Sequence, residues 1–247
     1  MWPRVRHLAR MLPPVLKRPL SRVFHALDAA RRERIVGRCL GELRERDWER
    51  GVDTSLLDEL RTAFGNTDWS ADTMYLAALA DRVLGTRGPF LECGSGLTTV
   101  VAGALAERRG RRVVSLEQDE AWHAHVTQTL RRFEIGAVTC SYAPLRPYGE
   151  YVWFDLRDTT LPTEFSAVFC DGPAVGRRWP EPLRGNWRAG LVPILSERHI
   201  RFGEILLDDA DDPRCGQLRR VWEAAGITTE VVETATGPIV VGRLGRR

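Results

Sequence analysis

Short apolar runs alternate with helical segments from residue 89 to the end of the chain, and few folds accommodate this order. The runs have the length of buried strands, and the segments between them show the spacing of amphipathic helices. We expect strands at residues 89–93, 112–117, 137–142, 165–170 and 204–208, and a closing hairpin at 228–234 and 239–244. This order predicts an α/β fold in which helices cover both faces of a mostly parallel, seven-stranded sheet.

The first 87 residues have a different pattern, in which apolar residues recur at helical spacing among many arginines. Helices are expected over residues 21–46 and 56–64. A third helix is expected to begin after Ser70, whose hydroxyl suits a helix N-cap. We therefore divide the chain into an N-terminal helical extension, residues 1–87, and an α/β core, residues 88–247.

The positive charge of the chain is concentrated near its start. Residues 1–50 contain 13 Lys and Arg against 6 Asp and Glu, whereas residues 51–247 contain 23 against 27. Because the core is net acidic and has no stripe of mixed aromatic and basic residues, we expect no nucleic-acid partner. The basic, partly apolar residues 1–24 either form a helical cap on the core or contact a membrane surface, and their prolines favour the cap.

Cysteine spacing and hydropathy bear on the environment of the protein. The five cysteines are scattered and none forms a C-x-x-C pair, so the sequence predicts neither a disulfide framework nor a zinc site. No apolar run reaches the length of a transmembrane helix. These features predict a cytoplasmic protein, and they leave open whether it forms a homo-oligomer.

The segment Phe90-Leu-Glu-Cys-Gly-Ser-Gly-Leu-Thr-Thr-Val leads from the first expected strand into a helix. Gly94 and Gly96 allow the backbone to turn tightly and to approach a ligand, and the free N–H groups of a helix start suit an anionic group. Glu92 precedes the turn. Glu117 ends the next strand, where a carboxylate can accept both hydroxyls of a ribose. These residues predict a site for a nucleoside cofactor, although glycine turns of this kind also serve packing alone.

The glycine turn departs from the dinucleotide-binding pattern G-x-G-x-x-G, because Thr99 stands where the third glycine belongs. The motif Leu91-Glu-Cys-Gly-Ser-Gly96 and three later motifs resemble class I S-adenosylmethionine-dependent methyltransferases, in particular small bacterial members. The later motifs are Ala143-Pro-Leu145, Asp171-Gly-Pro173 and Leu207-Asp-Asp209. The resemblance covers residues 89–244 and implies a Rossmann-like sheet with an antiparallel last strand.

The resemblance also implies roles for single residues. Gly94 and Gly96 would approach the methionine end of the cofactor, Glu92 would organise its ammonium group, and Glu117 would hold its ribose. Tyr142 and Ala143 would border the adenine. The remaining cofactor-binding residues expected from the resemblance are Ser95, Thr98, Gln118 and Asp171. Thr98 itself replaces a glycine that is frequent in the family.

Three carboxylates follow two neighbouring strands of the expected sheet. Asp171 comes after the fourth strand, and Asp208 and Asp209 end the fifth. They resemble the ligand set of metal-dependent O-methyltransferases, so Asp171, Asp208 and Asp209 are candidate ligands of Mg²⁺. Alternatively, Asp208 and Asp209 cap the following turn and Asp171 acts without metal as a general base. Asp171, Asp208 and Arg177 are the expected catalytic residues, since arginine can clamp an acidic acceptor, although Arg177 can equally lie in a solvated loop.

These expectations combine into one functional prediction. The protein is predicted to be an S-adenosylmethionine-dependent methyltransferase that methylates an oxygen of a small molecule or sugar, with a divalent metal as an optional assistant. An NAD(P)-dependent oxidoreductase would explain the sheet and Glu117 but not the missing third glycine. A non-catalytic protein that binds the cofactor is the third alternative, and in such a protein Asp171 would be dispensable.

Overall fold

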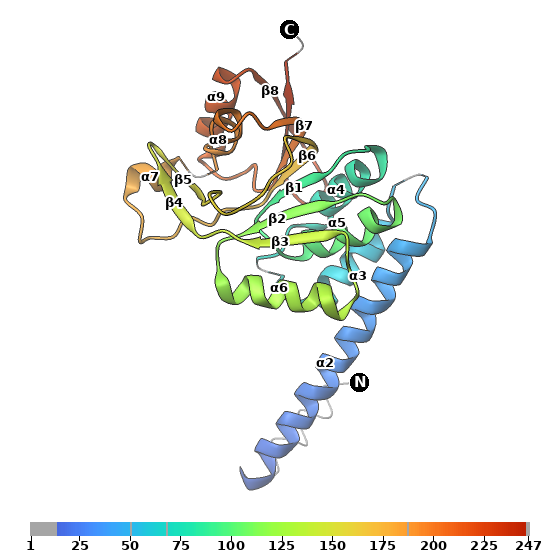
Figure 1. Ribbon diagram of the computed structural model, residues 1–247. Helices are drawn as coiled ribbons and strands as arrows, with labels where there is room; N and C mark the ends of the chain where they lie inside the picture. Colours follow the sequence, from blue (N-terminus) through green and yellow to red (C-terminus); the bar gives the residue numbers. More distant parts are fainter. Residues whose placement is uncertain (1–13, 50, 68, 187, 246–247) are drawn as a thin grey trace.

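The computed structural model describes residues 14–49, 51–67, 69–186 and 188–245, with the backbone alone for residues 14–25. A seven-stranded sheet in the order β3-β2-β1-β6-β7-β9-β8 forms its centre (Figure 1). The strands are β1 (Phe90–Cys93), β2 (Val113–Glu117), β3 (Val138–Tyr142), β6 (Glu164–Cys170), β7 (Arg201–Leu207), β8 (Ile227–Val232) and β9 (Ile239–Leu244). β9 is antiparallel to β7 and β8, and the other pairs are parallel. The predicted α/β sheet with a closing antiparallel hairpin is thus confirmed.

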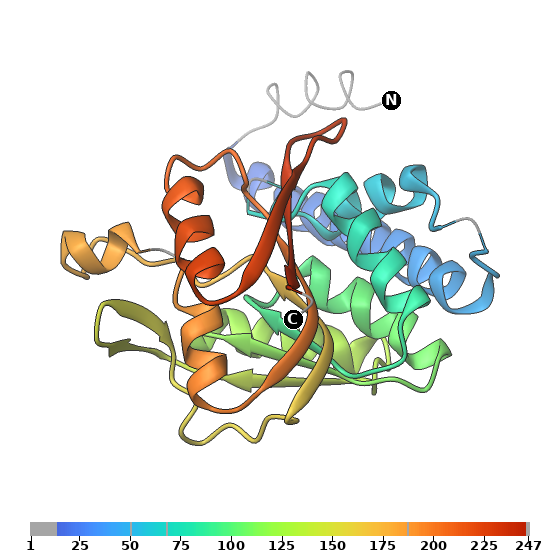
Figure 2. The ribbon, with the colours of Figure 1, turned by 90° about the horizontal axis from the view of Figure 1, so that it is seen from above.

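The sheet has a separate hydrophobic layer on each face, because successive side chains of a strand point to opposite sides. Phe90 belongs to one cluster of buried residues and Leu91 to the other. The first face is covered by α4 (Thr73–Gly85), α5 (Leu97–Arg108) and α6 (Glu120–Arg132), and the second by α8 (Leu191–Glu197) and α9 (Cys215–Ala224). Figure 2 shows the two layers on either side of the sheet.

The N-terminal helices join the first layer. α2 (Pro14–Glu45) packs against α5, and α3 (Thr54–Phe64) packs against α2 and α4. The start of α2 projects away from the rest of the molecule (Figure 1). α4 begins at Thr73, and its N-cap is Asp72, whose side chain accepts a hydrogen bond from the Tyr75 N–H at 2.8 Å. The predicted cap Ser70 is therefore wrong, and its hydroxyl instead donates to the carbonyls of Gly65 and Asn66.

Two other local predictions need correction. Residues between β3 and β6 form an unexpected antiparallel hairpin of β4 (Leu145–Tyr148) and β5 (Tyr151–Phe154), which buries Trp153 and Phe154 in the second layer. The single helix expected over residues 181–197 is two helices, α7 (Glu181–Gly185) and α8. The non-helical residues between them include Arg188, which lies in the site described below.

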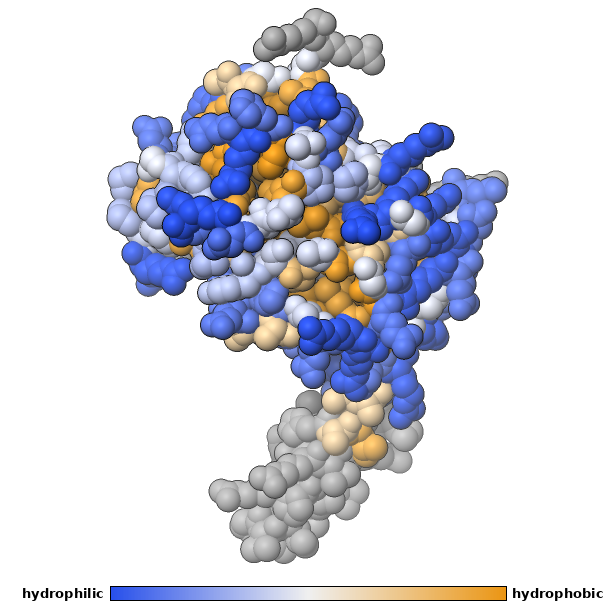
Figure 3. Space-filling view, viewed as in Figure 1, coloured by the Kyte–Doolittle hydropathy of each residue, from blue (hydrophilic) through white to orange (hydrophobic). Residues whose placement is uncertain are grey.

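On the face shown in Figure 3, hydrophilic residues surround an apolar area in the upper and middle part of the molecule. The large apolar residues that the described chain exposes are Leu27, Trp69, Tyr142, Val231 and Leu244. None of the described helices is long and apolar enough to cross a membrane. Residues 1–13 and the side chains of residues 14–25 lie outside the described part. The backbone of residues 14–24 forms the projecting start of α2 rather than the expected cap on the core, and contact with a membrane surface stays a prediction.

Candidate active site

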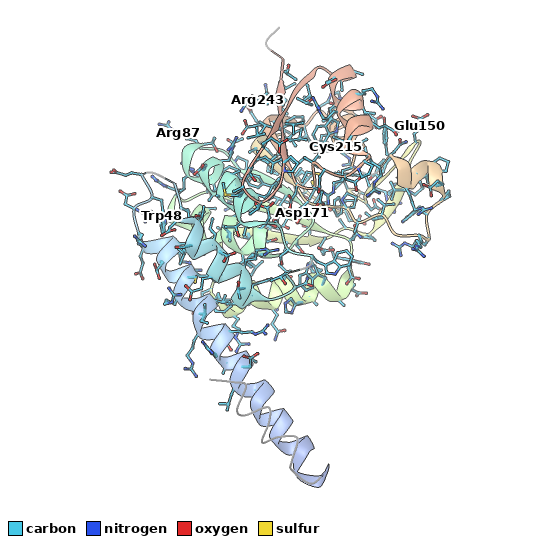
Figure 4. All side chains as sticks on the ribbon, turned by 180° about the vertical axis from the view of Figure 1, so that it is seen from behind. Trp48, Arg87, Glu150, Asp171, Cys215 and Arg243 are labelled. Carbon is cyan, nitrogen blue, oxygen red and sulfur yellow. The ribbon has the colours of Figure 1, made fainter. Side chains whose placement is uncertain are left out.

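A cavity of about 640 Å³ lies at the carboxyl ends of the parallel strands, which is the place where open α/β sheets bind ligands. Its volume is that of a typical small-molecule site. Asp171, which lines the cavity, lies near the middle of the molecule in Figure 4. The lining residues are Asn66, Trp69–Ala71, Gly94–Thr98, Glu117–Asp119, Trp122, Asp171–Ala174, Arg188, Asp208 and Asp209.

The backbone of the glycine turn after β1 is in direct contact with the backbone at the start of the loop after β6. Gly94 has φ +95°, and a Cβ on it would lie 2.9 Å from the backbone nitrogen of Gly172. A Cβ on Gly172 would lie 2.8 Å from Cα of Gly94. Each glycine is therefore needed because the other backbone occupies the space of its missing side chain. This contact gives a structural reason for the glycine of the Asp-Gly-Pro motif, to which the sequence analysis assigned no role.

Gly96 and the residues after it form the wall of the cavity that suits the anionic end of a ligand. Gly96 is the N-cap of α5, and a Cβ on it would meet nothing within 4 Å. Leu97 and Thr98, in the first turn of the helix, also line the cavity. The first N–H groups of a helix lack partners within the helix and carry the positive end of its dipole. The bare turn and the helix start together form a place where a carboxylate can bind.

Glu117 lies at the tip of β2 and is held from two sides. Its Oε2 accepts hydrogen bonds from the Ser95 N–H at 3.0 Å and the Ser95 hydroxyl at 2.7 Å. Its Oε1 accepts from the N–H groups of Gln118 at 2.7 Å and Asp119 at 2.8 Å. The carboxylate is buried, yet it lines the cavity. Glu117 is therefore an anchor of the glycine turn, and a ligand that binds its carboxylate must replace one of these four donors.

Glu92 lies further from the carboxyl ends of the strands than Glu117, because it is in register with Ser115 in the middle of β2. It is fully buried and does not line the cavity. The Thr99 hydroxyl donates to Glu92 Oε2 at 2.6 Å and accepts from the Gly96 N–H at 2.8 Å, and burial raises the pKa of Glu92 to about 7. Glu92 thus reaches the glycine turn through Thr99. This bond also accounts for threonine at the position where a dinucleotide site has glycine.

Two side chains after β2 connect the cavity walls. The indole N–H of Trp122 donates to the Ser95 carbonyl at 2.8 Å. The Gln118 side chain donates to the Ala174 carbonyl at 2.8 Å and accepts from the Ala174 N–H at 3.1 Å. Gln118 was expected at the site. Trp122 was missed, although its place in the first turn of α6, directly after the strand that ends at Glu117, is a signal that could have indicated it.

The two residues expected at the adenine lie next to Glu117 but are not among the residues that line this cavity. Tyr142 is 44% exposed at the end of β3, and its ring lies 6.0 Å from that of His123. Ala143 is fully buried in the second hydrophobic layer. Neither residue lines the cavity, so their contact with adenine stays a prediction.

The opposite end of the cavity holds the three predicted carboxylates together with an arginine that sequence analysis missed. Asp171, Asp208 and Asp209 all line the cavity. Arg188 Nη2 lies 2.9 Å from Asp209 Oδ2 and 3.5 Å from Asp171 Oδ1. Burial raises the pKa of Asp171 well above its usual range, with Arg188 opposing this shift. Burial also raises the pKa of Asp208 to about 7.

This donor set does not fit the expected Mg²⁺ ion. Within the described ranges, no group of three His, Cys, Asp or Glu side chains is arranged to hold a metal. The Arg188 guanidinium lies against the carboxylates that were predicted to be ligands, and a hard cation there would face its positive charge. Arg177, the predicted catalytic arginine, is exposed and does not line the cavity.

The loop between α3 and α4 contributes a part of the cavity that the sequence analysis did not predict. Asn66, Trp69, Ser70 and Ala71 line it, and Trp69 is 79% exposed. These residues belong to the predicted N-terminal extension, so the extension takes part in the site. A local sequence pattern could not indicate this, because only the packing of α3 and α4 brings the loop to the strand ends.

Comparison with known proteins supports the assignment of the fold. No family model and no curated protein matches the sequence. Among solved structures, the chain is similar to the SAH-bound methyltransferase PaMTH1 of Podospora anserina, with a TM-score of 0.55 and 17% identity over 80% of this chain and 90% of that one. The precorrin-6y C5,15-methyltransferase of Geobacter metallireducens GS-15 gives 0.50 and 16% over 72% and 91%. The N-terminal domain of human METTL16 gives 0.51 and 10% over 78% and 82%.

The chain has the class I methyltransferase fold. Within this fold, the cavity at the ends of β1 and β2 carries the features that a nucleoside cofactor with an amino-acid end requires. The bare turn at Gly94 and Gly96 admits close approach, and the start of α5 suits a carboxylate. Glu117 places a carboxylate in the cavity lining at the tip of β2, where ribose hydroxyls can exchange with one of its present donors. The described residues thus fit S-adenosylmethionine.

Proposed function

We propose that the protein is an S-adenosylmethionine-dependent methyltransferase that methylates a hydroxyl group of a small polar acceptor such as a sugar. The observation that carries this proposal is the acidic lining of a cavity built on the class I methyltransferase fold. Five carboxyl groups and one guanidinium line it, from Glu117, Asp119, Asp171, Asp208, Asp209 and Arg188.

The acidic lining favours S-adenosylmethionine over a nicotinamide dinucleotide as the cofactor. S-adenosylmethionine carries a positive sulfonium and a positive ammonium group, whereas a nicotinamide dinucleotide carries a negative pyrophosphate. Opposite charges attract and like charges repel most strongly in a partly desolvated cavity. Five carboxyl groups line the cavity against a single guanidinium. The lining therefore supports a cationic cofactor.

The proposed cofactor would lie along the glycine turn. Gly96 and the start of α5 would hold its carboxylate, and Glu117 would accept the ribose hydroxyls. When bound, S-adenosylmethionine supplies a methyl group on a sulfonium that an acceptor oxygen can attack directly. Such direct transfer needs no covalent intermediate on the enzyme.

Asp171 is the residue proposed to receive the proton that the acceptor hydroxyl loses. It stands at the end of β6, beside the glycine turn after β1, and lines the cavity. A carboxylate with a raised pKa is a better base near neutral pH than an ordinary one. Arg188 contacts Asp171 and fixes its orientation.

The acceptor end of the cavity suits a hydroxylated ring. The exposed indole of Trp69 offers an apolar face, and the half-exposed Asp209 offers a carboxylate that can accept hydroxyl hydrogen bonds. An apolar face combined with hydroxyl acceptors is the chemistry that recognises a sugar ring. This end of the cavity therefore supports a sugar-like acceptor.

Calorimetric titration with S-adenosylmethionine, S-adenosylhomocysteine and NADH tests the cofactor. We expect both sulfur nucleosides to bind and NADH not to bind, and binding of NADH alone would favour an oxidoreductase.

A second experiment follows radiolabelled methyl transfer to a panel of sugars and polyols. Asp171→Asn should abolish transfer and retain S-adenosylhomocysteine binding, whereas the exposed control Asp211→Asn should retain both. A non-catalytic binding protein would instead bind the cofactor and transfer no methyl group to any acceptor. In such a protein Asp171→Asn would leave S-adenosylhomocysteine affinity unchanged.

A further inference from the structure

Arg188 lies at the acceptor end of the cavity but comes from an unexpected part of the chain. It belongs to the non-helical residues between α7 and α8, rather than to the end of a strand. Its side chain is only 6% exposed although it lines the cavity. A buried arginine keeps its positive charge, because the guanidinium does not lose its proton in proteins.

The contacts of this guanidinium reach the ends of two neighbouring strands. At the end of β6, Nη2 donates to the Asp171 carbonyl and lies 3.5 Å from Asp171 Oδ1. After β7, Nη1 donates to the Asp208 carbonyl at 3.2 Å, and Nη2 donates to Asp209 Oδ2 at 2.9 Å. One cation thus joins the three residues that the sequence offered as candidate metal ligands.

The position of Arg188 disfavours a divalent ion at the same carboxylates. A bound Mg²⁺ or Mn²⁺ lies close to 2 Å from its carboxylate ligands. Asp209 Oδ2 and Asp171 Oδ1 lie 2.9 and 3.5 Å from Nη2, so an ion bound to either oxygen would lie within about 6 Å of this charged nitrogen. Their repulsion would be strong in this partly buried site.

We infer that Arg188 is a permanent cation that takes the place of a divalent metal at the acceptor end of this cavity, so that the site works without metal. It is a positioning residue, which holds the Asp171 and Asp209 carboxylates toward the acceptor and joins the ends of β6 and β7. The inference about metal exclusion stands on the geometry of Arg188. Its consequence for turnover rests on the proposed methyltransferase function.

The test measures Mn²⁺ binding by electron paramagnetic resonance on the full chain. Mn²⁺ is suitable because carboxylate oxygens bind it well and its signal reports free and bound ion separately. We expect no Mn²⁺ site in the wild type, and at least a tenfold gain in Mn²⁺ affinity in Arg188→Ala, where three carboxyl groups lose their cation. Arg188→Lys, which keeps the charge, should exclude Mn²⁺ as the wild type does. The exposed Arg198 provides the control Arg198→Ala, which should gain no site.

Several outcomes would overturn the inference. One is a Mn²⁺ site in the wild type that Asp171→Asn removes, which the wild-type titration can reveal even if Arg188→Ala does not fold. Another is a folded Arg188→Ala, or its substitute Arg188→Gln, without any gain in Mn²⁺ affinity. Titration of the same samples with S-adenosylhomocysteine tests the proposed function separately, because cofactor binding does not depend on how the acceptor end excludes metal.

Activity gives a second readout once an acceptor is known. Wild-type turnover should be unchanged after stringent chelation. Arg188→Lys should lower kcat about tenfold or more with little change in the KM for S-adenosylmethionine, because it disturbs the carboxylates and leaves the glycine turn intact. An equal loss in both parameters would indicate a merely structural role. Loss of wild-type turnover on chelation, restored by Mg²⁺, would contradict the inference directly.

Discussion

Glu117 has no spare acceptor position in this structure. A carboxylate offers about four lone-pair sites, and Glu117 accepts two bonds from Ser95, one from Gln118 and one from Asp119. Ribose hydroxyls that bind Glu117 must therefore replace one of these donors. The Ser95 hydroxyl is the donor that can leave most easily, because a side chain can rotate while the backbone N–H groups stay fixed.

Ser95→Ala should therefore strengthen cofactor binding. The variant removes the hydroxyl that competes with the ribose for Oε2 of Glu117, and an ordinary hydrogen bond is worth about 1 kcal/mol, or roughly fivefold in affinity. Calorimetric titration with S-adenosylhomocysteine measures the change, and Ser196→Ala, an exposed position on α8, is the control. A weaker affinity in Ser95→Ala would mean that the hydroxyl contacts the cofactor instead of competing with it.

Glu92 should make the stability of the protein depend on pH. Its pKa is raised from 4.5 to about 7 by burial, so between these values the folded chain holds a proton that the unfolded chain has lost. Stability falls with pH wherever the folded protein binds more protons. The contribution of Glu92 therefore decreases as pH rises from about 4.5 to about 7 and is constant above that.

Glu92→Gln removes this dependence, because glutamine does not ionise. The free energy of unfolding of the variant, relative to the wild type, should rise with pH over this window and level off above pH 7. At about 1.4 kcal/mol per pKa unit, the total change is about 3 kcal/mol. Urea unfolding of the ligand-free proteins at pH 5, 6, 7 and 8 measures it. Parallel stability curves for the two proteins would show that Glu92 ionises normally.

The sequence indicated some site residues and not others, for physical reasons. Gly94 and Glu117 were predictable, because a strand-to-helix turn needs bare backbone and a strand tip has a known position in a parallel sheet. Arg188 was not, because it is one of many arginines and its place depends on how the chain folds back between α7 and α8. The three aspartates line one cavity, and the positive group beside them is the Arg188 side chain.

At the scale of elements, the ends of β1 and β6 depend on each other. The backbone of Gly94 after β1 and that of Gly172 after β6 are in contact, and both residues line the cavity. A change at one glycine must therefore move the other strand end, including Asp171. A substitution at either glycine should therefore disturb the cavity, even though neither glycine contributes a side chain to it.

Gly94→Ala should destabilise the protein and abolish cofactor binding. Its Cβ would lie 2.9 Å from the Gly172 nitrogen, in a backbone conformation with φ +95° that alanine rarely adopts. Overpacking and an unfavourable φ together should cost about 1–3 kcal/mol or more. Gly216→Ala is the matched control, since its Cβ would meet only Arg220 at 3.9 Å within α9, where alanine should stabilise the helix. Equal melting temperatures for wild type and Gly94→Ala would contradict this backbone contact.

Element prediction failed where strand and helix signals are weak. The β4–β5 hairpin contains Pro147, which argues against a strand, and only Gly149, with φ +59°, marks its turn. The strands of the main sheet were found because their apolar runs are continuous, as burial on both faces requires. The split of the helix expected over residues 181–197 coincides with Gly185, the last residue of α7, and Gly190, the N-cap of α8. Glycine therefore marked this break, which the helical spacing of the apolar residues does not show.

At the scale of the whole molecule, the N-terminal helices and the sheet share one hydrophobic layer. About half of the buried residues in the first layer precede residue 88, among them Leu40 and Leu43 of α2, Leu57 of α3 and Tyr75 of α4. The hydroxyl of Tyr75 also donates to the Leu206 carbonyl in β7 at 3.2 Å. The division at residue 88 therefore marks a change in sequence periodicity, and the hydrophobic layer continues across it.

A fragment of residues 88–247 should fail to fold cooperatively. Without α2, α3 and α4 it would expose the apolar side chains of α5 and one face of β1 and β6, at about 25 cal/mol per Å² of newly exposed apolar surface. It would also lack the Asn66–Ala71 wall of the cavity. A chain starting at residue 30 is the control, because the described part of α2 before Ile35 has no buried side chain. Thermal unfolding followed by circular dichroism, with S-adenosylhomocysteine titration, distinguishes the two chains. The control should unfold in a sharp transition and bind S-adenosylhomocysteine. A sharp transition in the fragment would instead establish the α/β core as an independent domain.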